Sequence, residues 1–273
     1  MNLNPRNNQA DFNRFLFNDI NLEEYKYKFL RDCIQKSQHG QVPIYETSIL
    51  NISDTGWVLI LHSDMLLIYG ENWNEDQIHE ISEVFDLNVF TNFTLAGDDE
   101  LIDQIIDFYQ PRNYEVKKRR IFYQTDAIFI IENENINIRS AILQDLDELA
   151  MMLQQYYHEE YNGHNDKSIE EMQERILSHI QNATITVLEN EARELISFCT
   201  IVNPDIGILF TKQQHRNNGF GKVILSYCAN QLHNENETVY LMTDRDRVDS
   251  NIVCESVGFV PFFHYKMIEV NQT

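Results

Sequence analysis

Cysteine is scarce in this sequence, and its placement excludes the usual metal and disulfide frameworks. The four cysteines stand far apart, at Cys33, Cys199, Cys228 and Cys254, and no C-x-x-C pair occurs. The nine histidines show no metal spacing either. Disulfide scaffolds and zinc clusters both need cysteines at short or regular spacings. We therefore expect a reduced, cytoplasmic protein that holds no metal.

Positive charge is the second shortage. Lys and Arg number 21 against 43 Asp and Glu, which gives a formal net charge of −22. A surface of this sign repels phosphate backbones and anionic lipids, so we expect neither nucleic-acid nor membrane binding. It favours a cationic partner such as an amine. The basic run Lys117–Arg120 is short, and we expect it to be a solvated strand feature.

Long apolar runs are also missing. No stretch approaches the roughly 20 apolar residues of a membrane-spanning helix, and residues 1–8 hold no apolar segment typical of a secretory signal. These absences again favour the cytoplasm. Hydrophobic residues make up 43% of the 273 residues, which is enough for two modest domains or one large one.

Two common phosphate-binding motifs are absent. A Walker loop needs G-x-x-x-x-G-K-[ST], but here Gly221-Lys222 is followed by Val223. The dinucleotide motif G-x-G-x-x-G with an acidic residue on the next strand is not present either. A nucleotide triphosphatase and a nicotinamide-dependent enzyme are therefore disfavoured.

One glycine-rich segment remains, and it has the form of an anion site. The run 216–221 (RNNGFG) follows an apolar stretch at 206–211 that predicts a strand, and it precedes apolar residues at helical spacing. The first amides of a helix have no partner within the helix, and the helix dipole favours negative charge there. Because Gly219 and Gly221 lack a Cβ, a diphosphate can approach the backbone closely.

This R-x-x-G-x-G segment resembles the acyl-CoA diphosphate loop of the GNAT superfamily of acetyltransferases. The approach over 211–216 is also similar, although Gln213 stands where that family often has proline. Downstream, Asn251–Phe259 looks like the family's N-x-x-x-x-x-x-G-F segment. The alternative of a tight turn without a ligand is weakened by this second match in the right order. The resemblance covers about residues 136–270.

Periodicity and the resemblance give the same order of elements, β-α-α-β-β-β-α-β-α-β-β. The expected fold class is α/β (α+β), with a mixed, mostly antiparallel sheet flanked by helices, the GNAT fold. A capping box at Ser168–Glu171 predicts the start of the second helix. The other expected elements are a strand from Ile138, a helix over 146–153, strands at 184–189, 195–202, 206–211 and 239–243, a short helix ending near Gly258, and two terminal strands.

The polar stretch 132–137 is the expected domain boundary, with a GNAT acetyltransferase domain over 136–273. Residues 1–131 read as a degenerate GNAT-like domain without a CoA loop, which would make two such domains in tandem. At the place of the loop, Glu71, Glu75 and Asp76 would repel a diphosphate. An unrelated α+β domain remains the alternative. The elements expected in this half are a helix through Tyr25, Phe29 and Cys33, runs at 44–51, 57–61 and 65–69, a helix through Ile78, Ile81 and Phe85, an extended run at 88–95, a helix over 101–109, and extended pieces at 119–123 and 127–131.

The resemblance implies a cofactor site made mostly of backbone. Groups of Leu209, Phe210 and Thr211 would pair with the pantetheine arm, one N–H polarising the thioester. The Arg216 side chain would bind phosphate or brace the loop, and Asn251 would bond pantetheine or its own helix. The amides that would hold the diphosphate are those of Arg216, Asn217, Asn218, Gly219, Phe220, Gly221 and Lys222.

The proton-transfer groups are less determined. Many family members place a tyrosine where this chain has Cys254; a thiol, with an ordinary pKa of about 8.5, could protonate the leaving thiolate or simply pack in the core. Asp205, Glu159 and Glu160 are candidate bases, and each could equally be a solvated carboxylate. The polar–aromatic run 156–161 lies in the region that meets the acceptor in the family.

The sequence therefore favours an acetyl-CoA-dependent N-acetyltransferase that moves an acetyl group to an amine of a small molecule or peptide by direct transfer. One alternative is a non-catalytic acyl-CoA-binding sensor or interaction module. Another is a transferase for a longer acyl chain or an oxygen acceptor. The expected partners are the amine acceptor and, as one option, a second copy of the chain in a homodimer.

Overall fold

The chain divides into two units in a computed structural model, which describes residues 20–51, 56–73, 78, 81, 92–127, 136–164 and 166–271. Unit 1 comprises Met1–Phe122, Asp244–Asp246 and Phe263–Thr273, and unit 2 comprises Tyr123–Thr243 and Arg247–Phe262. Each unit has a mixed, mostly antiparallel sheet with helices on its faces, so the expected fold class is confirmed.

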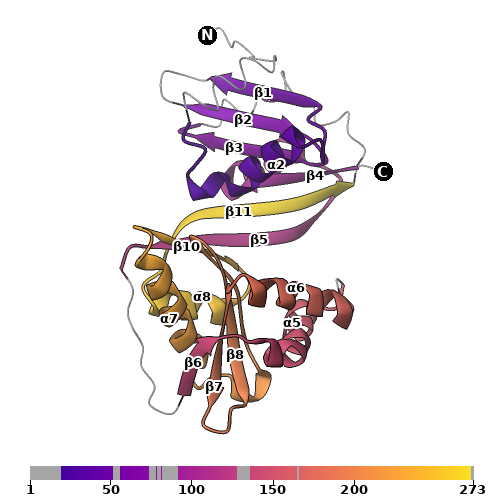
Figure 1. Ribbon diagram of the computed structural model, residues 1–273. Coiled ribbons are helices and arrows are strands. Elements are labelled where there is room, and N and C mark those ends of the chain that lie inside the picture. Colours follow the sequence, from indigo (N-terminus) through magenta and orange to yellow (C-terminus); the bar gives the residue numbers. More distant parts are fainter. Residues whose placement is uncertain are drawn as a thin grey trace. The chain divides into compact units, whose positions relative to one another are not determined.

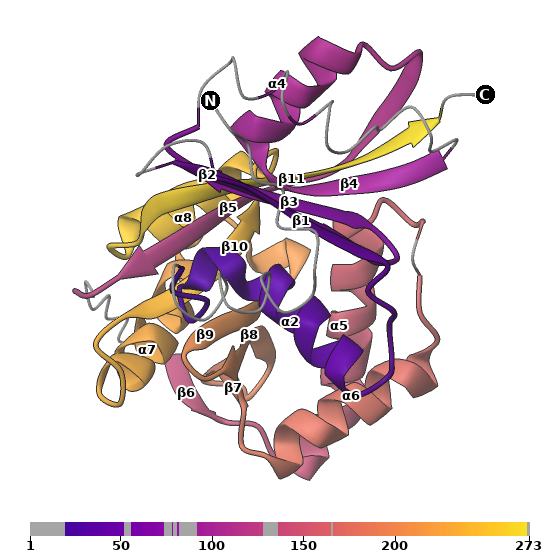
Figure 2. The ribbon, with the colours of Figure 1, turned by 90° about the horizontal axis from the view of Figure 1, so that it is seen from above.

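Unit 1 is built on strands in the order β1-β2-β3-β4-β11. In Figure 2, helices α2 and α4 lie on opposite faces of this sheet. β4 runs parallel to β3 and antiparallel to β11. The elements are η1 (Tyr25–Tyr27), α2 (Lys28–Gln38), β1 (Glu46–Asn51), β2 (Trp57–His62), β3 (Leu66–Glu71), β4 (Asn92–Asp98), α4 (Asp99–Tyr109) and β11 (Val260–Asn271); β5 (Asn113–Thr125) begins in unit 1 and ends in unit 2.

Side-chain alternation along the strands divides the core of unit 1 between the two helices. Val58 and Ile68 pack with Leu101 of α4 in one cluster. On the other face, the Tyr27 ring lies 5.5 Å from that of Tyr69, edge to face. Strand residues therefore serve both faces, as the two-residue period of a strand requires.

Unit 2 has the strand order β10-β9-β8-β7-β6. Figure 1 shows α5 and α6 on one face of these strands and α7 and α8 on the other. The predicted capping box is confirmed, since Ser168 and Glu171 exchange side-chain and backbone hydrogen bonds. The elements are β6 (Ile136–Ser140), η3 (Leu143–Asp145), α5 (Leu146–Glu160), α6 (Ile169–Gln181), β7 (Ile185–Asn190), β8 (Leu195–Val202), β9 (Asp205–Thr211), η4 (Gln213–His215), α7 (Phe220–His233), β10 (Val239–Asp244) and α8 (Val248–Ser256).

The same order of elements occurs in both units. Three antiparallel strands (β1–β3 and β7–β9) are followed by a strand parallel to the third, then by a helix and a long strand. In unit 1 the two parallel strands of this pattern, β3 and β4, are closely paired. β3 and β4 pair at three positions, and Gly97 has φ +143°, where a Cβ would lie 1.8 Å from the Ile68 carbonyl oxygen. The two strands of unit 1 are therefore in direct contact over residues 66–68 and 95–97.

The strand ends differ from the sequence expectation in two places. The extended piece expected at 119–123 lies within a longer strand, β5, which ends at Thr125, while residues 128–131 of the piece expected at 127–131 lie outside the described residues. The two expected terminal strands are also one, β11, because the sequence 262–271 contains no glycine, proline or other turn signal that would divide it. Ile78 and Ile81 are helical as predicted; Glu75, Asp76, Phe85 and residues 88–91 lie outside the described residues.

β11 contributes residues to both units. Its residues Tyr265–Asn271 pair antiparallel with β4, so this part of the strand belongs to unit 1, although the sequence analysis counted it with the second half. Ile268 and Val270 are buried in the unit 1 core. Unit 1 is thus assembled from both halves of the chain.

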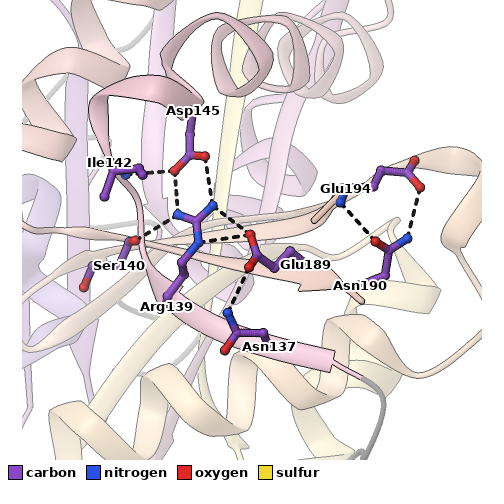
Figure 3. A network of polar contacts seen from close by, with 8 residues as sticks. All are labelled: Asn137, Arg139, Ser140, Ile142, Asp145, Glu189, Asn190 and Glu194. Atoms are coloured by element: carbon purple, nitrogen blue, oxygen red, sulfur yellow. Dashed lines mark hydrogen bonds and ion pairs between the residues drawn. The ribbon is translucent and has the colours of Figure 1, made fainter. Parts of the chain in front are cut away.

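An arginine-centred ion-pair network ties the first strand of unit 2 to its neighbours (Figure 3). The Arg139 guanidinium donates to both carboxylate oxygens of Asp145 at 2.7 and 2.9 Å, and to Glu189 at 2.8 and 3.0 Å. Burial raises the pKa of Asp145, but hydrogen bonds from Arg139 and from the Ile142 N–H outweigh it and lower the pKa below its ordinary value. Hydrogen bonds from Arg139 and then Asn137 lower the pKa of Glu189.

Replacing Arg139 with methionine is expected to lower the free energy of unfolding of unit 2 by about 3 kcal/mol at pH 7. The substitution leaves two largely buried carboxylates without their cation. Both carboxylates have lowered folded-state pKa values, so their stabilising effect is full above the unfolded-state values of about 4 and is lost as the pH falls through the folded values. The difference between the variant and the wild type should therefore shrink toward pH 3.

Urea unfolding at pH 7 and pH 3 measures both effects. Arg193→Met is the matched control, because Arg193 is an exposed arginine of the same unit for which the described residues show no side-chain partner. A loss in Arg139→Met no larger than in that control would contradict the stabilising role of the network.

Among the described residues, no helix is long and apolar enough to cross a membrane. The same residues contain no group of three or more His, Cys, Asp or Glu side chains arranged to hold a metal ion.

Candidate functional site

The ladder between the parallel strands β9 and β10 is open. The two strands pair only at Asp205 and Tyr240, next to a hydrogen bond of 3.3 Å from the Tyr240 N–H to the Pro204 carbonyl. All residues of both strands are described, and no further pair joins them. The strands therefore separate toward their carboxyl ends. We refer to this opening, from Asp205 to Thr211 on β9, as the β9/β10 gap.

Strand alternation decides which backbone groups of β9 face this gap. The N–H groups of Lys212 and Ile208 donate toward β8, to the Ile196 carbonyl at 3.0 Å and to Thr200 Oγ1 at 2.7 Å. Since successive residues of a strand turn their backbone groups to opposite sides, Leu209 and Thr211 direct theirs away from β8. They therefore point into the gap.

Phe210 does not share this orientation, which corrects one part of the expected pantetheine contacts. Its carbonyl faces β8 and accepts a hydrogen bond of 2.7 Å from Ser197 Oγ. Its side chain packs in the core with α5 and α6. Only Leu209 and Thr211 of the three predicted residues offer backbone groups to a ligand in the gap.

A β-bulge lies just before these residues. The β8–β9 register shifts between Cys199 and Ile201, opposite Gly207. A Cβ on Gly207 would lie 2.4 Å from Thr200 Oγ1. Because Gly207 has no Cβ, the Thr200 hydroxyl has room to accept a hydrogen bond from the Ile208 N–H. A bulge re-aims the residues that follow it. Gly207 is a lone glycine within an apolar strand pattern, which is the sequence signal for such a bulge.

The glycine loop begins α7 as predicted. Asn217 and Gly219 take left-handed φ values of +64° and +80°. The first hydrogen bonds of the helix come from Lys222 and Val223 to the Gly219 carbonyl, so the amides of residues 220 and 221 precede the helical ladder. A Cβ at Gly219 would meet nothing within 4 Å, so the space in front of the loop is open. Asn218 Nδ2 secures the turn by donating to the carbonyls of residues 215 and 216 at 3.2 and 3.0 Å.

Two basic residues just before the glycine loop contact carboxylates of other elements. Lys212 Nζ lies 2.6 Å from Glu148 of α5, and His215 Nε2 lies 3.1 Å from Glu194 of the β7–β8 turn. Lys222 differs, because the described residues show no ion pair for it. Its ammonium, in the first turn of α7, is the cation of the loop that remains available to an anionic ligand.

Arg216 is already engaged. Its Nη2 donates to Glu159 Oε2 at 2.7 Å, its Nε donates to the Thr211 carbonyl at 2.9 Å, and its guanidinium carbon lies 5.3 Å from the centre of the Phe210 ring. Of the two predicted roles, these contacts are those of a brace. The Thr211 carbonyl is thereby occupied, which leaves Leu209 as the residue with both backbone groups directed into the gap.

Polar side chains also lie on the β10 side of the β9/β10 gap. The Thr243 hydroxyl donates to Asn251 Oδ1 at 2.5 Å, so Asn251 ties α8 to β10. The buried Tyr123 hydroxyl donates to Glu255 of α8 at 3.3 Å, and burial followed by the Glu255 charge raises the Tyr123 pKa. Tyr123 escaped the sequence analysis because it lies in the segment counted with the first half.

The three residues expected to carry catalysis, Cys254, Asp205 and Glu160, lie on three different elements. The Cys254 side chain, in α8, is only 4% exposed, and burial and then the nearby Glu255 raise its pKa to about 12. Such a thiol is a poor proton donor, so packing accounts for it better. Asp205 is buried at the closed end of the gap, and Glu160 ends α5.

No protein-family model and no curated protein matches the chain. Solved structures do match it. The X-ray structure of a Drosophila protein has a TM-score of 0.54 at 12% identity, over 98% of each chain. A GNAT-family acetyltransferase from Colwellia psychrerythraea has a TM-score of 0.50 at 11% identity, over the full length of both chains. Identities this low show the fold alone, and that fold is the GNAT fold.

Proposed function

We propose that this protein is an acetyl-CoA-dependent N-acetyltransferase of the cytoplasm, acting on an amine of a small molecule or peptide. One observation carries the proposal. Leu209 directs its backbone groups into the β9/β10 gap, where the ladder is open. This gap leads directly to the free helix N-terminus at residues 219–222. Such an arrangement suits a ligand that has an extended amide-containing arm at one end and a diphosphate at the other.

The two parts of the site have different tasks. Leu209 would pair with the pantetheine arm and polarise the thioester oxygen. The amides of Phe220 and Gly221, with the Lys222 ammonium, would hold the diphosphate. The amine nitrogen then attacks the thioester carbon, the C–S bond breaks, and CoA leaves as thiolate and takes up a proton. Most of the acceleration would come from holding the two reactants together.

The proton balance needs a base for the amine. Asp205 and Glu160 are the carboxylates we retain for this task, and the net charge of −22 supports a cationic acceptor that loses its proton in the site. Burial raises the pKa of the Tyr123 hydroxyl as it raises that of the Cys254 thiol, so neither group is retained as the acid, and the leaving thiolate takes its proton from water.

The proposal is tested by measuring CoA release from acetyl-CoA with a panel of amines, polyamines, aminoglycosides and peptides. Turnover with one class identifies the acceptor. Absence of any heat with CoA or acetyl-CoA in calorimetry would overturn the proposal. Binding without turnover would favour the second candidate, a non-catalytic acyl-CoA-binding module, which the buried thiol at position 254 supports.

The Cys254→Ala variant should keep its acetyl transfer within about threefold of the wild type and lose roughly 1 kcal/mol of stability. The buried thiol packs as a small apolar group, so its removal leaves a small cavity and no missing proton donor. Steady-state kinetics and thermal unfolding of the same sample check both. A hundredfold fall in kcat with unchanged stability would show that the thiol takes part in the chemistry.

A further inference from the structure

Glu159, in the last turn of α5, joins the two sides of the β9/β10 gap. Its carboxylate accepts from Arg216, which follows β9, and its backbone carbonyl accepts from Arg247, which follows β10 as the N-cap residue of α8. Gln155 holds the other carboxylate oxygen at 2.9 Å. One residue thus connects the chain segments that leave both separated strands.

The ion pair between Glu159 and Arg216 is weak enough for Arg216 to exchange Glu159 for a phosphate group. The two side chains are 30% and 37% exposed, so water screens the pair and its net stabilisation is modest. A phosphate group offers a guanidinium a stronger, bidentate partner. Arg216 also stands at the start of the glycine loop, where the diphosphate would sit under the proposed function.

We propose that Glu159 is a positioning residue that occupies Arg216 in the free protein and yields it to the diphosphate when acyl-CoA binds. This inference rests on the proposed function, because it needs acyl-CoA at the loop. The exchange resolves the two roles expected for Arg216: it braces the loop without ligand and binds phosphate with it. It also frees a carboxylate at the end of α5 for a cationic acceptor, so the donor would bind first.

The test is the affinity for CoA of Glu159→Gln, measured by calorimetry. The variant keeps the size of the side chain and its contact with Gln155 but removes the competing charge. CoA should bind about two- to fivefold more tightly than to the wild type. Glu174→Gln is the matched control, an exposed α6 carboxylate with no partner among the described residues, and its affinity should stay at the wild-type value.

A second variant tests the other half of the exchange. Arg216→Gln should bind CoA at least tenfold more weakly, since it removes a phosphate contact. In the Arg216→Gln background, Glu159→Gln should no longer tighten binding. This double-mutant cycle separates the exchange from a general change in surface charge, which would act in both backgrounds.

The outcomes distinguish this inference from the proposed function. Wild-type binding with unchanged or weaker affinity in Glu159→Gln would overturn the exchange and leave the transferase proposal standing. Unchanged CoA affinity in Arg216→Gln would also overturn it, even if Glu159→Gln failed to fold. Absence of CoA binding by the wild type and every variant would overturn both.

Discussion

Replacing Gly219 with valine should abolish the protection that CoA gives unit 2 against thermal unfolding. Gly219 has φ +80°, a left-handed conformation that costs a residue with a Cβ about 1–2 kcal/mol and a β-branched residue more. The valine side chain would also fill the open space in front of the loop, where the diphosphate is proposed to sit. Together these effects should weaken CoA binding at least about a hundredfold, roughly 2.7 kcal/mol.

Gly40→Val is the matched control for this experiment. Gly40 has φ +69°, and a Cβ at this position would meet nothing within 4 Å, but the residue lies in unit 1, after α2. It therefore suffers the same backbone strain away from the proposed site. A thermal shift series at fixed CoA concentration should show wild-type protection in Gly40→Val. Retained protection in Gly219→Val would rule out the loop as the diphosphate site.

The second large effect is expected at Ile268, where aspartate should prevent the cooperative folding of unit 1. Ile268 is 0% exposed, pairs with Leu95 of β4 and belongs to a core cluster of the unit. A carboxylate there would be buried without a partner and would leave the volume of an isoleucine poorly filled. We expect the free energy of unfolding of unit 1 to fall by more than about 4 kcal/mol. Hydrogen exchange measures this loss, because the β4 amides of the variant should exchange with deuterium faster than those of the wild type.

His264→Asp is the control on the same strand. His264 is exposed, so the new aspartate stays in water and costs less than about 1 kcal/mol in strand propensity. Its hydrogen-exchange pattern should resemble that of the wild type. If Ile268→Asp left the β4 amides protected, β11 would not be an essential strand of unit 1.

Local elements of this protein were predictable because they depend on short-range chemistry. The capping box at Ser168, the helix that begins after Gly219 and the apolar runs that became β7, β8 and β9 all follow from residues within a few positions of one another. The glycine loop was identified the same way, since a helix N-terminus beside two glycines is a local feature.

Long-range pairings were not predictable from those patterns. An apolar run at 265–270 predicts a strand but not that its partner is β4, more than 160 residues earlier in the sequence. Side-chain networks share this limit: Arg139 meets Asp145 nearby, but Glu189 only through the β6–β7 pairing. The occupation of Arg216 by Glu159 likewise depends on where α5 ends in space.

The placement of β11 has a consequence for synthesis on the ribosome. Residues 265–271 complete the sheet of unit 1, yet they are translated after every element of unit 2. At about 5–20 residues per second, β4 waits for many seconds with one edge uncovered. Most of unit 2 is translated during this interval, whereas unit 1, although begun first, is finished last. An unpaired strand edge is a template for pairing with other chains. We therefore expect a chaperone to matter most while the N-terminal half has been translated and residues 265–271 have not.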